Sequence, residues 1–149
     1  MTEQVFEHRW LGRLRRYGKD QVIGHIDIDP NVRPARLKGG SDAEVLVTVG
    51  PVCDGSEFDA ILESAVRRIR AALADLENIK VSAVALAPAN WRRHYENADA
   101  RPLIERLFLE GFDVISPSEM EIAFDFEDLD LLVVRVDADG QAGEAHLHP

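Results

Sequence analysis

An apolar stripe over residues 56–78 constrains the fold of this chain more than any other feature of its sequence. Its members recur at spacings of three and four residues, the period of an amphipathic helix: Phe58, Ile61, Leu62, Ala65, Ile69, Leu73 and Leu76. Ser56 can act as the N-cap, with Asp59 three residues on, close to a capping box. The pattern predicts a long helix that buries this stripe against the core.

Strand patterns lie on both sides of this helix. Val45–Val49 is a short apolar run before it, and residues 81–87 form an apolar run after it without a polar face. Such a run is typical of a central strand that is covered on both faces. Strand, helix and strand together predict a right-handed βαβ unit. Residues 21–29 alternate with a period of two, which predicts another strand. The segment 30–43, with its Pro and Gly residues, predicts a long loop.

The two ends of the chain differ in pattern. Residues 1–18 are predicted as an N-terminal helix, because Phe6, Trp10 and Leu14 recur at every fourth position and Gly18 can form the C-cap. Shorter helices are expected at 91–97 and from Pro102 to Gly111. Alternation then predicts strands over 112–116, 119–126, 130–137 and 141–147. The sequence thus predicts a single α+β domain over residues 1–149, with a mixed β-sheet, a central βαβ unit, antiparallel C-terminal hairpins and two to four helices.

Composition fits a cytoplasmic protein. A chain of 149 residues can bury a core without disulfides or metals, and the lone Cys53 excludes an intramolecular disulfide, as expected in a reducing compartment. The N-terminus carries Glu3 and Glu7 and has no apolar signal-peptide region. No apolar run approaches the roughly 20 residues that a membrane span needs, so no membrane contact is expected. The excess of Arg over Lys, 14 to 3, favours a bacterial source.

Charge is distributed unevenly along the chain. The net charge is −10, yet residues 1–40 hold eight basic residues against five acidic ones. Residues 111–149 hold ten acidic residues against Arg135 alone. Direct nucleic-acid binding is not expected of such a chain, because neutralising phosphates requires a basic face.

An acidic surface on the C-terminal strands is therefore the predicted partner-binding site. Its residues are Glu119, Glu121, Asp125, Glu127, Asp128, Asp130, Asp137 and Asp139. Like charges crowded on a sheet are mutually destabilising, so their presence indicates either a contribution to solubility or a basic partner. The function predicted is that of a small protein-binding module that masks a basic protein, as an inhibitor or immunity protein masks a toxin or nuclease. The sequence predicts nothing about homo-oligomers.

Asp128 and Asp130 support an alternative prediction. The D-x-D string before an apolar run resembles the carboxylate strand of the nucleotidyltransferase superfamily, which implies a Mg²⁺ site for phosphoryl or nucleotidyl transfer. The Gly-Ser that this superfamily has upstream is replaced here by Ser116-Pro117-Ser118. A hairpin turn between two strands explains the same string, because Asp is a preferred turn residue. No catalytic residue, metal ligand or cofactor is predicted.

Two histidine patterns and one loop are further candidate sites. His25-x-Asp27 could begin a 2-His-1-carboxylate iron site, with His146 or His148 as a distant third ligand. Separately, Glu144, His146 and His148 would share one face of the last strand. The simpler interpretation of the first pattern is a solvent-exposed strand face, and the last three residues are as prone to fraying as to coordination. The segment 50–56 could bind an anion at a helix N-terminus, but it lacks the Lys that a P-loop requires.

Two other features have a structural interpretation and a functional one. Cys53, near the same helix N-terminus, could be a nucleophile or a half-buried structural thiol. The aromatic and basic run 91–95 could contact bases or stack Arg on an aromatic ring. The structural interpretation is preferred for both.

Overall fold

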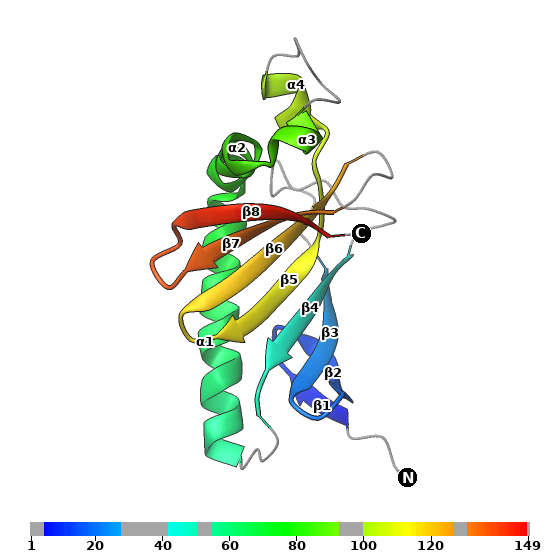
Figure 1. Ribbon diagram of the computed structural model, residues 1–149. Helices are drawn as coiled ribbons and strands as arrows, with labels where there is room; N and C mark the ends of the chain where they lie inside the picture. Colours follow the sequence, from blue (N-terminus) through cyan, green and yellow to red (C-terminus); the bar gives the residue numbers. More distant parts are fainter. Residues whose placement is uncertain (1–4, 28–41, 51–54, 93–99, 127–130, 149) are drawn as a thin grey trace.

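One mixed sheet of eight strands forms the framework of the protein (Figure 1). The computed structural model describes residues 5–27, 42–50, 55–92, 100–126 and 131–148. The elements follow in the order β1 (Val5–His8), β2 (Gly12–Tyr17), β3 (Gln21–Asp27), β4 (Asp42–Thr48), α1 (Gly55–Ala74), α2 (Leu76–Leu86), α3 (Ala89–Arg92), α4 (Ala100–Glu105), β5 (Phe108–Ser116), β6 (Glu119–Asp125), β7 (Leu131–Asp137) and β8 (Ala142–His148). The predicted α+β class with a mixed sheet is confirmed.

The strands lie in the sheet in the order in which they occur in the chain. Neighbours pair antiparallel, with one exception among the described strands, because β4 and β5 are parallel. Parallel neighbours need a crossover connection, and here the helices α1 to α4 lie between the two strands in the chain. The crossover therefore divides the sheet into two four-stranded antiparallel halves.

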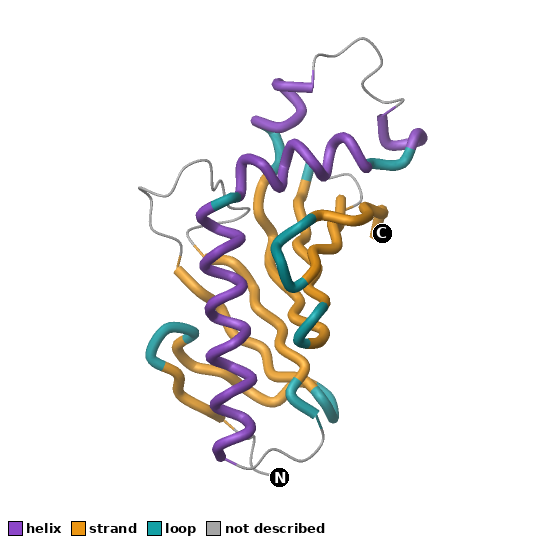
Figure 2. Tube along the Cα trace, turned by 90° about the vertical axis from the view of Figure 1, so that its left-hand side faces the viewer, coloured by secondary structure: helices purple, strands orange, loops and turns teal. Residues whose placement is uncertain are grey.

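Helix α1 crosses one face of the sheet (Figures 1 and 2). Phe58, Leu62 and Ile69 from its stripe are buried, with Ile69 at 0% exposure. Ile61 and Leu73 lie at the margin of the core and are partly buried. The facing strands supply alternate residues, of which the C-terminal half contributes Met120, Ile122, Phe124, Leu132, Val134 and Val136. The core thus lies between α1 and one face of the sheet.

The predicted N-terminal helix is wrong, since residues 5–17 form the hairpin β1–β2. Phe6 and Leu14 are directly opposed across this hairpin, and the Phe6 ring lies 4.7 Å from that of Phe58 on α1. The spacing of eight residues between Phe6 and Leu14 fits a helix. It fits two paired strands equally well, because directly opposed residues point to the same face of a sheet. Gly18, expected as a C-cap, does adopt a positive φ of 67°, but in the turn between β2 and β3.

The predicted central strand over residues 81–87 is also wrong. Residues 81–86 belong to helix α2 and Ala87 is its C-cap; on the helix Val81 is 47% and Leu86 39% exposed. An apolar run of seven residues is compatible with either structure, and here it continues a helical segment that bends after Ala74. Consequently the parallel partner of β4 is β5 and not residues 81–87.

The helix predicted from Pro102 to Gly111 is shorter than expected. It ends at Glu105, and Gly111 lies within β5 rather than at a helix end. At Gly111 a Cβ would lie 2.5 Å from the carbonyl oxygen of Glu44 on β4. Glycine is therefore required where these parallel strands approach each other. Most of the predicted loop 30–43 lies outside the described residues.

Candidate functional site

The face of the sheet opposite α1 bears no helix in the described part of the chain, and we call it the open face (Figure 1). Its residues alternate with those of the core. One row of directly opposed residues crosses all eight strands in the order Val5, Arg15, Ile23, Leu46, Asp113, Glu121, Arg135 and Glu144. The β2 end of this row is basic and the β5–β8 end is predominantly acidic. In the sequence the charge asymmetry lies between two segments of the chain. In the fold it becomes an asymmetry between the two ends of this row.

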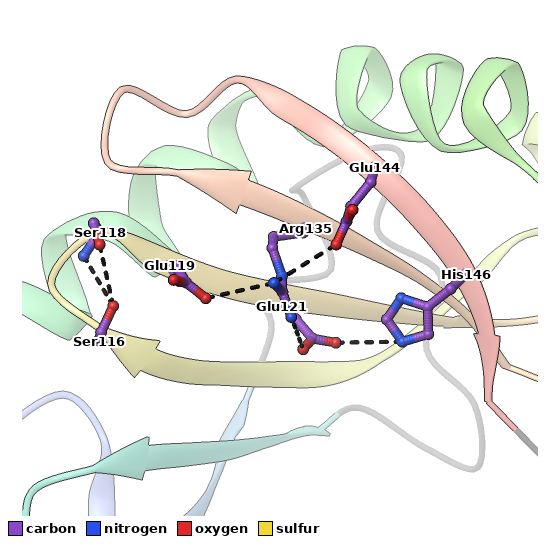
Figure 3. A network of polar contacts seen from close by, with 7 residues as sticks. All are labelled: Ser116, Ser118, Glu119, Glu121, Arg135, Glu144 and His146. Carbon is purple, nitrogen blue, oxygen red and sulfur yellow. Dashed lines mark hydrogen bonds and ion pairs between the residues drawn. The ribbon is translucent and has the colours of Figure 1, made fainter.

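Arg135 on β7 is the centre of a polar network on the acidic half (Figure 3). Its Nη2 donates to Oε1 of Glu121 at 3.1 Å, and its Nη1 lies 3.6 Å from carboxylate oxygens of both Glu119 and Glu144. The hydrogen bond with Glu121 is the main reason why the pKa of Arg135 is raised. His146 Nε2 lies 3.7 Å from the second oxygen of Glu121. Three carboxylates thus share one guanidinium, and the network retains an excess of negative charge.

Asp113 on β5 borders this network. It is directly opposed to Glu121 across the β5–β6 pair, and its Oδ1 is buried without a hydrogen-bond partner among the described residues. Burial raises the pKa of Asp113, and the charge of Glu121 raises it further. A cation near this pair would relieve the repulsion between the two carboxylates.

The structure places the predicted acidic residues in several environments. Glu119 and Glu121 belong to the Arg135 network. Asp137 and Asp139 lie at the β7–β8 turn, where Oδ1 of Asp137 accepts hydrogen bonds from the backbone N–H groups of Asp139 and Gln141, both at 2.9 Å. Asp137 therefore shapes a turn. The remaining predicted acids on the connection between β6 and β7, Glu127, Asp128 and Asp130, lie outside the described residues.

Asp125 requires a correction. It was expected on an exposed acidic face, yet it is only 6% exposed. It lies at the end of β6, directly opposed to Phe108 at the start of β5. Alternation assigns a residue to one face of a sheet, but it does not reveal which neighbours cover that face.

Sequence reasoning did not include Asp113, Arg135 and Glu144 in the site. The Asp139-Gly140 turn predicts the β7–β8 hairpin and so a position for Glu144 near Arg135, although a register shift between Arg135 and Val136 is what makes the two residues directly opposed. For Asp113 no comparable local signal exists, since its position depends on the irregular register between β5 and β6.

The His25-x-Asp27 pattern and the histidines considered as its third ligand are not brought together. His25 lies on β3 and His146 on β8, in the two different halves of the sheet. In the described residues no group of three or more His, Cys, Asp or Glu side chains could hold a metal ion. Cys53 and most of the segment 50–56 lie outside these residues. The possible phosphoryl-transfer site at Asp128 and Asp130 does so as well.

Trp91 occupies the core and is not available for stacking on bases. It is 2% exposed, and its ring meets that of Phe126 edge-on at 5.5 Å. The guanidinium of Arg106 lies over the same phenyl ring, 5.1 Å from its centroid. The remainder of the aromatic and basic run, residues 93–95, lies outside the described part of the chain.

Comparisons with known proteins add no relatives. No family model matches the sequence, and no curated protein or solved structure is significantly similar to the chain. Over the residues that the structure describes, no helix is long and apolar enough to span a membrane. Function is therefore argued from the open face itself.

Proposed function

We propose that this chain is a small acidic, cytoplasmic protein-binding module that engages a basic partner through the acidic half of its open face. In its most specific form the proposal is an inhibitor or immunity-type protein that masks a toxin or nuclease. The observation that carries it is the excess of carboxylates around Arg135, together with the buried, unpartnered Oδ1 of Asp113 beside Glu121. The site contains negative charge that the described residues leave uncompensated.

The arrangement favours recognition of cationic side chains. Glu119, Glu121 and Glu144 converge on one guanidinium. Carboxylates placed in this way can also bind the Arg and Lys side chains of a partner. Charges on a protein surface act mainly on the association rate and on the choice of partner. Phosphate-rich partners are disfavoured by the same field. A protein with a basic active site or binding face is the partner class that fits.

The test compares two variants with equal charge changes. The first neutralises the open face through Asp113→Asn, Glu119→Gln and Glu144→Gln, while Glu121 and Arg135 retain their pair. The matched control neutralises three exposed acids elsewhere through Asp20→Asn, Asp59→Asn and Glu77→Gln. Wild type and both variants are used as baits in extracts of the native host, and retained polypeptides are identified and quantified.

The proposal expects a stoichiometric basic polypeptide on the wild type and on the control. With the open-face variant, association of the purified partner should be slower by about tenfold and less sensitive to salt, because exposed charges are screened beyond about 8 Å at physiological ionic strength. Equal loss in both variants would assign the effect to net charge alone. If the wild type retains no basic polypeptide, the acidic surface serves solubility and the proposal is wrong.

A further inference from the structure

A groove of about 410 Å³ lies between α1 and the carboxyl ends of the parallel strands β4 and β5. Its walls are mainly apolar: Val49 follows β4, Val114 and Ile115 belong to β5, and Ile61 and Ala65 come from α1. This volume is within the range of small-molecule sites, roughly 300–1,000 Å³. The groove is separate from the open face, since α1 and Val114 belong to the opposite, core side of the sheet.

The groove has one charged group at each end of its helical wall. Glu57 lies near the start of α1 and Arg68 three turns later, about 16 Å apart along the axis at 1.5 Å per residue. Arg68 is held in place by a hydrogen bond from its Nη1 to the backbone oxygen of Ser116, at 2.6 Å. Among the described lining residues Arg68 is the one cation and Glu57 the one acid.

The guanidinium of Arg68 is incompletely satisfied. Its Nη2 is buried and has no hydrogen-bond partner among the described residues, and burial lowers the pKa of Arg68. A buried donor without an acceptor is costly, and more so when it carries charge. Arg68 lines the groove, and its Nη1 is already bonded to the backbone oxygen of Ser116, another lining residue, so Nη2 is the nitrogen left to bind a ligand. An anionic oxygen there would be its natural acceptor.

From these features we infer that the groove binds a small aliphatic monocarboxylate, with its carboxylate on Arg68 and its tail along Ile61, Ala65 and Ile115. The apolar walls require an apolar tail. One cation accommodates one anionic group, and the described lining has no second cation for another. This inference is independent of the basic partner proposed for the open face.

Probes of one tail length and different head groups test the charge preference in the wild type. Octanoate, octanol, octylammonium and the dicarboxylate suberate are titrated into the full chain by isothermal titration calorimetry. Octanoate should give saturable one-to-one binding, with affinity falling from octanoate to octanol to octylammonium, and suberate should bind more weakly than octanoate. Absence of saturable octanoate binding at millimolar concentration, or equal affinity for octylammonium, overturns the inference.

Variants then locate the site. Arg68→Gln should reduce octanoate affinity roughly tenfold or more, to the level of octanol, because a charge-assisted hydrogen bond is lost. Gln retains N–H donors without the charge, which limits damage to the fold. Ser64→Leu should fill the groove and abolish binding of both ligands. Arg70→Gln removes the same charge from an exposed position and should leave binding unchanged; a loss equal to that of Arg68→Gln also overturns the assignment.

Discussion

Replacement of Ile69 by Ala tests whether α1 packs on the sheet as described. Ile69 is 0% exposed, near the middle of α1, and belongs to the main core cluster. Removing a buried Ile side chain to Ala costs about 2–5 kcal/mol, through lost burial and the cavity that remains. The helix propensity of Ala is more favourable than that of Ile by a few tenths of a kcal/mol, which offsets only a small part of this cost. We therefore expect a loss of about 3 kcal/mol in the free energy of unfolding.

Such a loss is large beside the roughly 5–15 kcal/mol by which domains are stable. For a domain of this size, about 3 kcal/mol should lower Tm by roughly 6–12 °C. Urea unfolding followed by far-ultraviolet circular dichroism measures the change, and its slope with denaturant should stay constant if only the native packing is altered. Arg70→Ala, on the same turn but exposed, is the control and should remain within about 0.5 kcal/mol of wild type. A loss below about 1 kcal/mol for Ile69→Ala, or one equal to the control, would refute this position of α1.

Three further predictions concern charged residues. Asp125→Lys should destabilise by about 2 kcal/mol or more in urea unfolding, because the site is buried, whereas Asp139→Lys at an exposed turn should change stability by less than about 0.5 kcal/mol; equal effects would contradict the burial of Asp125. Asp113→Asn should stabilise the protein at pH 7 and have little effect below the ordinary pKa of 3.8. The pKa of Asp113 is raised in the folded state, so the free energy of unfolding of the wild type falls as pH rises from 3.8 through the raised pKa, and Asn removes this loss. Glu63→Gln should instead destabilise the protein at pH 7. The hydrogen bond from His8, at 3.0 Å, holds the pKa of Glu63 below its ordinary 4.5. The stabilisation by the ionised Glu63 is therefore present above pH 4.5 and is lost as pH falls through the lowered pKa. For both residues, unfolding curves at pH 7 and pH 3 give the difference, and a difference that does not vary with pH would count against these contacts.

The C-terminal half of the fold was largely readable from the sequence. Strands β6, β7 and β8 differ from the predicted 119–126, 130–137 and 141–147 by a residue or so at each end. Their alternation is clear because one face meets the core and the other meets solvent, so the pattern is imposed by local geometry. The helix α1 was readable for the same reason, at a period near 3.6 residues. Its predicted extension to residue 78 missed the bend after Ala74.

The N-terminal hairpin and helix α2 were decided by the tertiary structure. Phe6 and Leu14 face α1 whether they lie on a helix or on two paired strands, and the choice depends on β3, which pairs with β2 and extends the sheet. Residues 81–87 are apolar on every side, and a run this short does not define its own period. Their helical state follows from a crossover that must carry the chain from β4 to the parallel strand β5.

For the candidate sites, the sequence determined which residues carry charge, and the structure determined which of them meet. The excess of acids after residue 111 was visible at once. Register alone brought Glu119, Glu121 and Glu144 to Arg135 and left Asp113 facing Glu121. The groove at Arg68 had no signal in the sequence, because it exists only where α1 crosses the ends of β4 and β5, strands separated by about sixty residues of intervening chain. Contacts between segments so far apart depend on how the elements pack, and local periodicity contains no information about that packing.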